Sequence, residues 1–262
     1  MNNNPIRHTF SVLLDGAPFS FSGRARLRGR DTLSLYPALF SLDFWNLPEE
    51  WRLRLSRARA ASVSFDGACL ASGRVRDVFH HGDPDGIRTT VSLSLGLELW
   101  EAVVSLSVPA ETAMSETVRR ILAASGAGIP LLSLPGPDPV FPRAQAFFGR
   151  AAECAASVLS AAPARPMLTP AGLKAVSPFD PPAAVRVTER DLLDVPAFTG
   201  GSLRGAPTLM VLQAAVSGWR PGQVLDVRCG DVRARGLVTE RSVSADTDSG
   251  DWKCELVSEV IS

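Results

Sequence analysis

The stretch Leu35–Phe65, LYPALFSLDFWNLPEEWRLRLSRARAASVSF, is the best-defined local pattern in the chain. Two apolar, β-rich runs flank a segment whose apolar residues recur at helical spacing. Asn46 is followed three residues later by Glu49, which is the spacing of a capping box, and Pro48 suits a first helical turn. The pattern predicts a strand, a helix and a strand in that order, with Asn46 as the helix N-cap.

The apolar stripe of this helix is expected to pack against a sheet. The stripe consists of Leu47, Trp51, Leu55 and Ala58, and Trp45 borders it. We interpret both tryptophans as core anchors rather than as ligand-stacking residues, because they lie on or beside the stripe.

Alternating runs separated by turn dipeptides predict short strands up to about residue 107. Asp15-Gly16 and Asp66-Gly67 are strong hairpin signals. We expect a strand at Phe19–Leu27 that ends at Gly29–Asp31, and we expect an interrupted or edge strand at Pro37. This spacing of strands around one helix is typical of a barrel or a sandwich.

The rest of the chain divides into a mixed section and a second β-rich section. Ser115–Ala124 predicts a helix ended by Gly126, Pro130–Pro142 an irregular connector, and Gln145–Ala162 a second helix. Thr188 and Asp191 have the spacing of a helix cap. Further strands are expected at Val185–Thr188, Thr208–Val216, Val224–Val227, Ala234–Val243 and Trp252–Ile261. The predicted domains are residues 1–107, 108–178 and 179–262.

Composition narrows the function classes. The 262 residues are 45% hydrophobic and 21% charged, and 27 basic residues balance 27 acidic ones, so the net charge is +0. Specific nucleic-acid binding usually needs a basic excess, and we do not expect it here. No apolar run approaches the length of a membrane span, and the N-terminal run is too short for a signal peptide. We expect synthesis in the cytoplasm.

A local basic row is the main charged feature. Arg24, Arg26, Arg28 and Arg30 alternate, so a strand would place all four on one face. The row is either a solvated sheet face or a contact face for an acidic partner surface, because arginine suits carboxylate recognition.

Patterns that carry catalysis or bind metals are weak. His80 and His81 precede Asp83 and Asp85, which invites a metal hypothesis, but the Pro-Asp-Gly sequence there favours a turn. The glycine-rich segment at Gly200, Gly201, Ser202 and Gly205 lacks the lysine of a phosphate loop and is interpreted as a flexible loop.

The carboxylates and cysteines also give no recognised site. Asp43 and Glu49–Glu50 are carboxylate candidates in name only, and capping explains Glu49 better. Cys69, Cys154, Cys229 and Cys254 form no CxxC motif, and whether Cys229 faces Cys254 stays open. We predict no catalytic residue, no cofactor-binding residue and no metal ligand.

Five segments together resemble the phage tail baseplate hub proteins, in particular Mu-like tail hubs and the late control protein D family. They are FSLDFWNLPEEWRLRL, SETVRRILAASG, RAQAFFGRAAECAASVLSAA with LTPAGLKAV, VTERDLLDVPAF, and the C-terminal run that begins at GWRPGQVLDV and ends at DWKCELVSEV. Taken in this order, the five segments cover nearly the whole chain. The resemblance implies a mainly β fold with an α+β middle section, in which two tail-tube-like β-barrel domains are linked by a small α+β domain.

The resemblance also implies a function without catalysis. It implies a homotrimeric hub in the virion tail that joins the sixfold tail tube, or a distal tail protein, to the threefold central spike, with the tape measure protein as a further candidate partner. The alternatives are another tail component, such as a tube-terminating or distal-tail ring, and a tail-associated cell-wall hydrolase.

Overall fold

One large sheet dominates the structure, a computed structural model that describes residues 9–21, 23–177, 179, 182–200, 209–215, 218–250 and 252–261. Its N-terminal β half consists of β1 (Phe10–Leu14), β2 (Ala17–Phe19), β3 (Ala25–Thr32), β4 (Ala38–Trp45), β5 (Ala60–Phe65), β6 (Ala68–Asp83) and β7 (Gly86–Leu95). Its C-terminal β half consists of β15 (Val185–Thr188), β16 (Ala197–Thr199), β17 (Leu209–Ala215), β18 (Val224–Cys229), β19 (Val232–Asp246) and β20 (Trp252–Ile261).

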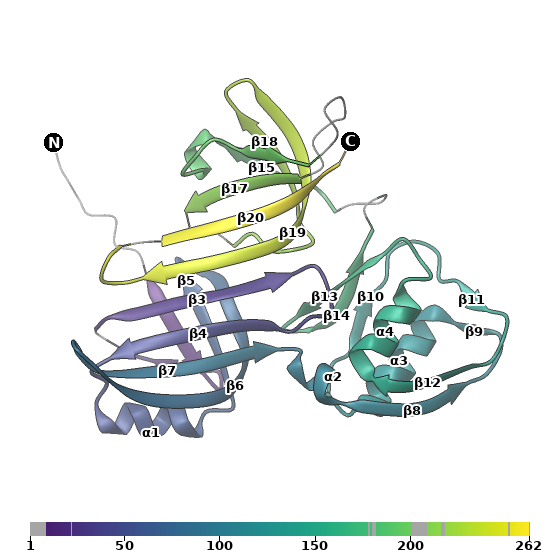
Figure 1. Ribbon diagram of the computed structural model, residues 1–262, viewed down its shortest axis with the longest axis horizontal. Helices are drawn as coiled ribbons and strands as arrows, with labels where there is room; N and C mark the ends of the chain where they lie inside the picture. Colours follow the sequence, from purple (N-terminus) through teal and green to yellow (C-terminus); the bar gives the residue numbers. More distant parts are fainter. Residues whose placement is uncertain are drawn as a thin grey trace.

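The two halves are joined edge to edge. The 13 strands follow the order β16-β17-β20-β19-β3-β4-β7-β6-β5-β1-β2, with β18 and β15 branching from β19. The antiparallel pair β3–β19 is the seam, and Figure 1 shows the two halves one above the other across it. The prediction of a mainly β protein is confirmed. The described strands form an open sheet, and two closed barrels are not observed.

Local turn chemistry explains the hairpins. Asp15 and Gly16 have φ of 49° and 80°, and Asp66 and Gly67 have φ of 45° and 80°, as a tight hairpin turn needs. They connect β1 to β2 and β5 to β6, so both predicted hairpins are confirmed. The strand predicted from Phe19 is wrong at its start, because β2 ends at Phe19 and β3 begins at Ala25, whereas the end of β3 at Thr32 lies one residue past the predicted Gly29–Asp31.

Helix α1 (Glu49–Arg57) begins later than predicted. Its N-cap is Pro48, without a side-chain capping bond, so the predicted Asn46 cap is wrong. Asn46 has φ of 55°, and its side chain donates to the carbonyl of Asp85 at 3.0 Å and accepts from the N–H of Ile87 at 3.0 Å. These long-range bonds fix the β6–β7 turn instead of capping the helix.

The section between the halves is an α+β unit that projects to one side of the sheet in Figure 1. It consists of α2 (Leu97–Glu101), β8 (Val103–Val108), β9 (Thr112–Ala113), α3 (Met114–Ser125), β10 (Leu131–Ser133), β11 (Val140–Phe141), β12 (Gln145–Arg150), α4 (Ala151–Leu159), β13 (Arg165–Thr169) and β14 (Gly172–Val176). Gly126 ends α3 with φ of 65°, as predicted. The predicted helix Gln145–Ala162 is wrong in its first third, which is β12 paired with β8.

Two large clusters of buried side chains hold these parts together, and a third, smaller one consists of Leu33, Met167, Val224 and Leu237. One is shared by both β halves and runs from Val12 to Leu256. The other packs α3 and α4 against β8 and β14 and includes Leu35 from the N-terminal half. The predicted helix stripe belongs to the first cluster, with Leu55 fully buried and Trp51 packed against it. The two β halves therefore share a hydrophobic core as well as a sheet.

The short turn after β15 follows its sequence. Thr188 and Asp191 form a reciprocal capping box over a 3₁₀ turn at Glu189–Asp191, which confirms that spacing. The Thr188 hydroxyl and N–H both lie 2.8 Å from the Asp191 carboxylate.

Candidate functional site

The arginine row lies on the outer face of β3, beside the seam. Ala25 and Leu27 of β3 point into the core, so the alternate positions Arg26, Arg28 and Arg30 point outward. Arg24 directly precedes the strand. The predicted common face is thus observed. It lies between β4 of the N-terminal half and β19 of the C-terminal half.

Arg24 is neutralised within the chain. Its guanidinium lies 3.2 Å from Asp246 and 3.5 Å from Asp85, and 4.3 Å from the centre of the Trp45 ring. The hydrogen bond to Asp246 raises the pKa of Arg24. Burial disfavours the charge of Asp246, but hydrogen bonds from the N–H of Asp248 and from Arg24 outweigh this and hold the pKa of Asp246 below its ordinary value.

The next arginines also have internal partners. Arg26 lies 3.1 Å from Asp43, and Arg30 forms an ion pair with Glu240 across the seam. Arg28 is exposed and has no ion pair within the described part of the chain. The row as a whole is therefore a cross-strand ion network, and only Arg28 remains available to a partner.

Arg28 belongs to a polar row that crosses the seam. Strand register aligns Ser244 of β19 and Ser41 of β4 on either side of Arg28. The same row extends to Lys253 on one side and to Ser92 and Asp77 on the other. One row of polar residues, in which Ser244 and Ser41 flank Arg28, thus crosses from one half to the other.

The predicted metal candidates lie on a hairpin. His80 Nδ1 is 3.1 Å from Thr89 Oγ1 across β6 and β7, and Asp85 is in the turn, where it pairs with Arg24. Among the described residues, no group of three His, Cys, Asp or Glu side chains could hold a metal ion. The turn interpretation is confirmed by the β6–β7 pairing.

The other sequence candidates are separated. Asp43 accepts from Arg26 and Thr90, whereas Glu49 and Glu50 are exposed in the first turn of α1. Gly200 has φ of 75°, and Gly201, Ser202 and Gly205 lie outside the described residues.

The cysteines are free thiols. Cys229 is opposite Val232, and Cys254 is opposite Ala214 and Val243, so the two are not cross-strand neighbours.

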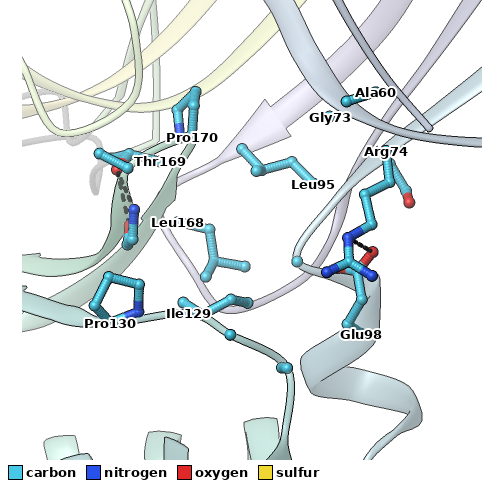
Figure 2. A pocket seen from close by; sticks show the side chains of 16 residues that line it. Ala60, Gly73, Arg74, Leu95, Glu98, Ile129, Pro130, Leu168, Thr169 and Pro170 are labelled. Carbon is cyan, nitrogen blue, oxygen red and sulfur yellow. Dashed lines mark hydrogen bonds and ion pairs between the residues drawn. The ribbon is translucent and has the colours of Figure 1, made fainter. Parts of the chain in front are cut away.

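A cleft of about 280 Å³ separates the N-terminal half from the α+β unit. In Figure 2, Arg74 and Glu98 form an ion pair on one wall, with Nε 3.2 Å from Oε1, and Ile129, Leu168 and Pro170 form the opposite wall. The residues that line the cleft include neither His nor Cys. The lining therefore provides a crevice of mixed polar and apolar surface, with one internal ion pair and no recognised couple of nucleophile and base.

One functional candidate was missed by sequence reasoning. Arg241 of β19 is only 1% exposed and forms a bidentate ion pair with Asp31 of β3, at 2.8 and 2.9 Å. It is directly opposite Asp31 in the seam. The sequence signal was an arginine at a core position of an alternating strand, but its partner is 210 residues away.

Within the described residues, no helix is long and apolar enough to cross a membrane. No family model matches the sequence, and no curated protein matches it.

Solved structures do match. The tail protein from Neisseria meningitidis MC58 is 11% identical with a TM-score of 0.71, and the match covers 96% of each chain. The chain has the fold of a phage tail protein. The 43 kDa tail protein of prophage MuSo2 from Shewanella oneidensis is 11% identical with a TM-score of 0.70, covering 96% of this chain and 98% of that one.

The same fold occurs in a secretion machine. The E. coli c3393 protein, a type VI secretion system component with structural similarity to the T4 bacteriophage tail proteins gp27 and gp5, is 14% identical with a TM-score of 0.72. The match covers 96% of this chain and 77% of that chain. The resemblance to phage tail proteins is thus confirmed at the level of the fold.

Proposed function

We propose that this protein is the structural hub of a phage tail baseplate, a homotrimeric adaptor between a sixfold tail tube and a threefold central spike, without catalysis. The observation that carries the proposal is the match over 96% of the chain to two tail proteins, which includes both β halves and the α+β unit.

The arrangement of parts supports an adaptor between two symmetries. Each chain has two curled β halves side by side in one sheet, and one α+β unit that projects from it. Three copies in a ring would present six β halves but only three α+β units. The β halves of such a ring would have approximate sixfold symmetry, and its α+β units would have threefold symmetry.

The open sheet supports a ring in particular. Its strand order ends at β16 on one side and at β2 on the other, and residues 76–83 of β6 pair only with β7 among the described strands. Free strand edges favour pairing with another chain. A head-to-tail contact between copies would pair one free edge of each copy with a free edge of the next copy around the ring.

The remaining parts of the proposal follow from this role. The partners would be the tail tube or a distal tail protein, the spike, and the tape measure protein as a further candidate, and the site of action would be the virion tail after synthesis in the host cytoplasm. The division into residues 1–107, 108–178 and 179–262, with tube-like barrels at both ends, stays part of the proposal.

Light scattering of the purified chain tests the proposal. A hub gives a mass three times the 27.9 kDa of one chain. A hexamer would instead favour a tube-terminating or distal-tail ring. Clearing of a cell-wall zymogram would contradict the absence of catalysis and revive the hydrolase alternative.

A further inference from the structure

The two β halves meet in a second way besides the seam. The hairpin formed by β5 and β6 packs against the inner side of the C-terminal half, where the Trp252 ring lies 4.3 Å from that of Phe65. Arg220 donates to the carbonyl of Cys69 at 2.7 Å. The seam and the hairpin together determine how the halves sit relative to each other.

Arg241 connects both contacts. Its Nε and one Nη bind the two carboxylate oxygens of Asp31, and the same Nη donates to the carbonyl of Leu70 at 2.7 Å. Asp31 belongs to the seam and Leu70 to the hairpin. One buried side chain of β19 thus bonds to two other strands at the junction between the halves, β3 and β6.

An apolar pair would fill this position without a desolvated charge, so the ion pair needs another explanation. A role in setting the strand register would explain why the ion pair is there. Strands held only by alternating apolar residues can slip by two positions and keep the same face buried. A two-residue slip of β19 along β3 would place Arg241 opposite Gly29 or beyond the end of β3, and it would leave the buried Arg241 and the partly buried Asp31 without their partners.

We propose that the Asp31–Arg241 pair is the register lock of the seam, and that it fixes the relative position of the two β halves. The pair selects one alignment among several that the apolar core would accept. Its further consequence, that a locked seam is required for three copies to close a ring, rests on the proposed hub function.

The test replaces the charged pair by an apolar one, Arg241→Met with Asp31→Leu. The matched control is Arg30→Met with Glu240→Leu, because this ion pair joins the same two strands on the exposed face. Arg241→Lys is a third variant, which keeps the positive charge beside Asp31 and should retain the register even where the apolar pair folds poorly.

Spin labels at Glu50 and Asp231 report the position of one half relative to the other, because both residues are exposed and lie in different halves. Cys69, Cys154 and Cys229 are first replaced by Ser, and buried Cys254 is kept. The distance between the labels is measured by pulsed electron paramagnetic resonance, and the mass by light scattering.

The expected result is one distance for the unsubstituted seam, the control and Arg241→Lys. The apolar pair should add a second distance population, shifted by about 7 Å for a two-residue slip, and should lose the trimer. A single unchanged distance in the apolar pair would overturn the register lock. If the unsubstituted chain is not a trimer, the hub function fails, but the distance measurement still decides the lock.

Discussion

Arg241→Met alone should be among the most destabilising substitutions in the chain. It leaves the Asp31 carboxylate, whose side chain is 17% exposed, without its partner, and it leaves the carbonyl of Leu70 without its donor. Removing one member of a buried ion pair costs about 3–5 kcal/mol. We expect the loss in that range, because all three hydrogen bonds of Arg241 are 2.9 Å or shorter.

Equilibrium unfolding in urea at a fixed protein concentration measures the effect. Concentration must be fixed because assembly adds to the apparent stability. Adding Asp31→Leu to Arg241→Met should restore most of the lost free energy, since the unpaired buried charge is removed. Arg30→Met, which breaks an exposed pair, should cost about 0–1 kcal/mol. The reasoning is refuted if Arg241→Met costs no more than Arg30→Met.

Three further predictions concern the stability of the fold. Gly29→Ala should cost about 1–3 kcal/mol in thermal unfolding, because a Cβ there would lie 2.1 Å from Phe40 Cδ1. Leu55→Ala should cost about 2–5 kcal/mol, whereas Leu53→Ala, at a side chain that is 49% exposed, should change the unfolding free energy little. Burial raises the pKa of Cys254 to about 12 from an ordinary 9.0, so the folded state favours the thiol, and stability should fall as pH rises above 9.0. Cys254→Ala should flatten that fall in pH-dependent unfolding; an equally steep fall would count against the shift.

Features set by neighbouring residues could be predicted from the sequence. Asp15-Gly16 and Asp66-Gly67 adopt the positive φ that their turns require, and Gly126 ends α3, because each needs only local backbone chemistry. The positions of the C-terminal strands could be predicted for the same reason, because apolar and polar residues alternate along them. The resemblance to tail hubs then supplied the fold class that these local patterns left open.

Features set by distant partners could not be predicted from the sequence. Asn46 has the spacing of a helix cap, but the β6–β7 turn, about forty residues later, takes both of its side-chain bonds. Gln145–Arg150 contains apolar spacing that suits a helix, but β8 offers it a full strand partner. Of the candidate site, the common face of the arginine row was predictable, but its carboxylate partners on β4 and β19 were not.

The seam also determines the order in which the molecule can be completed. β3 leaves the ribosome more than 200 residues before the β19 positions that pair with it. Throughout that interval β3 has one neighbour, β4, and a free edge that could pair with another nascent chain. Arg24 and Arg30 then lie along this edge before their partners Asp246 and Glu240 have been made. Like charges on an edge strand discourage such pairing. The residues that form ion pairs across the finished seam can thus protect it from aggregation during synthesis.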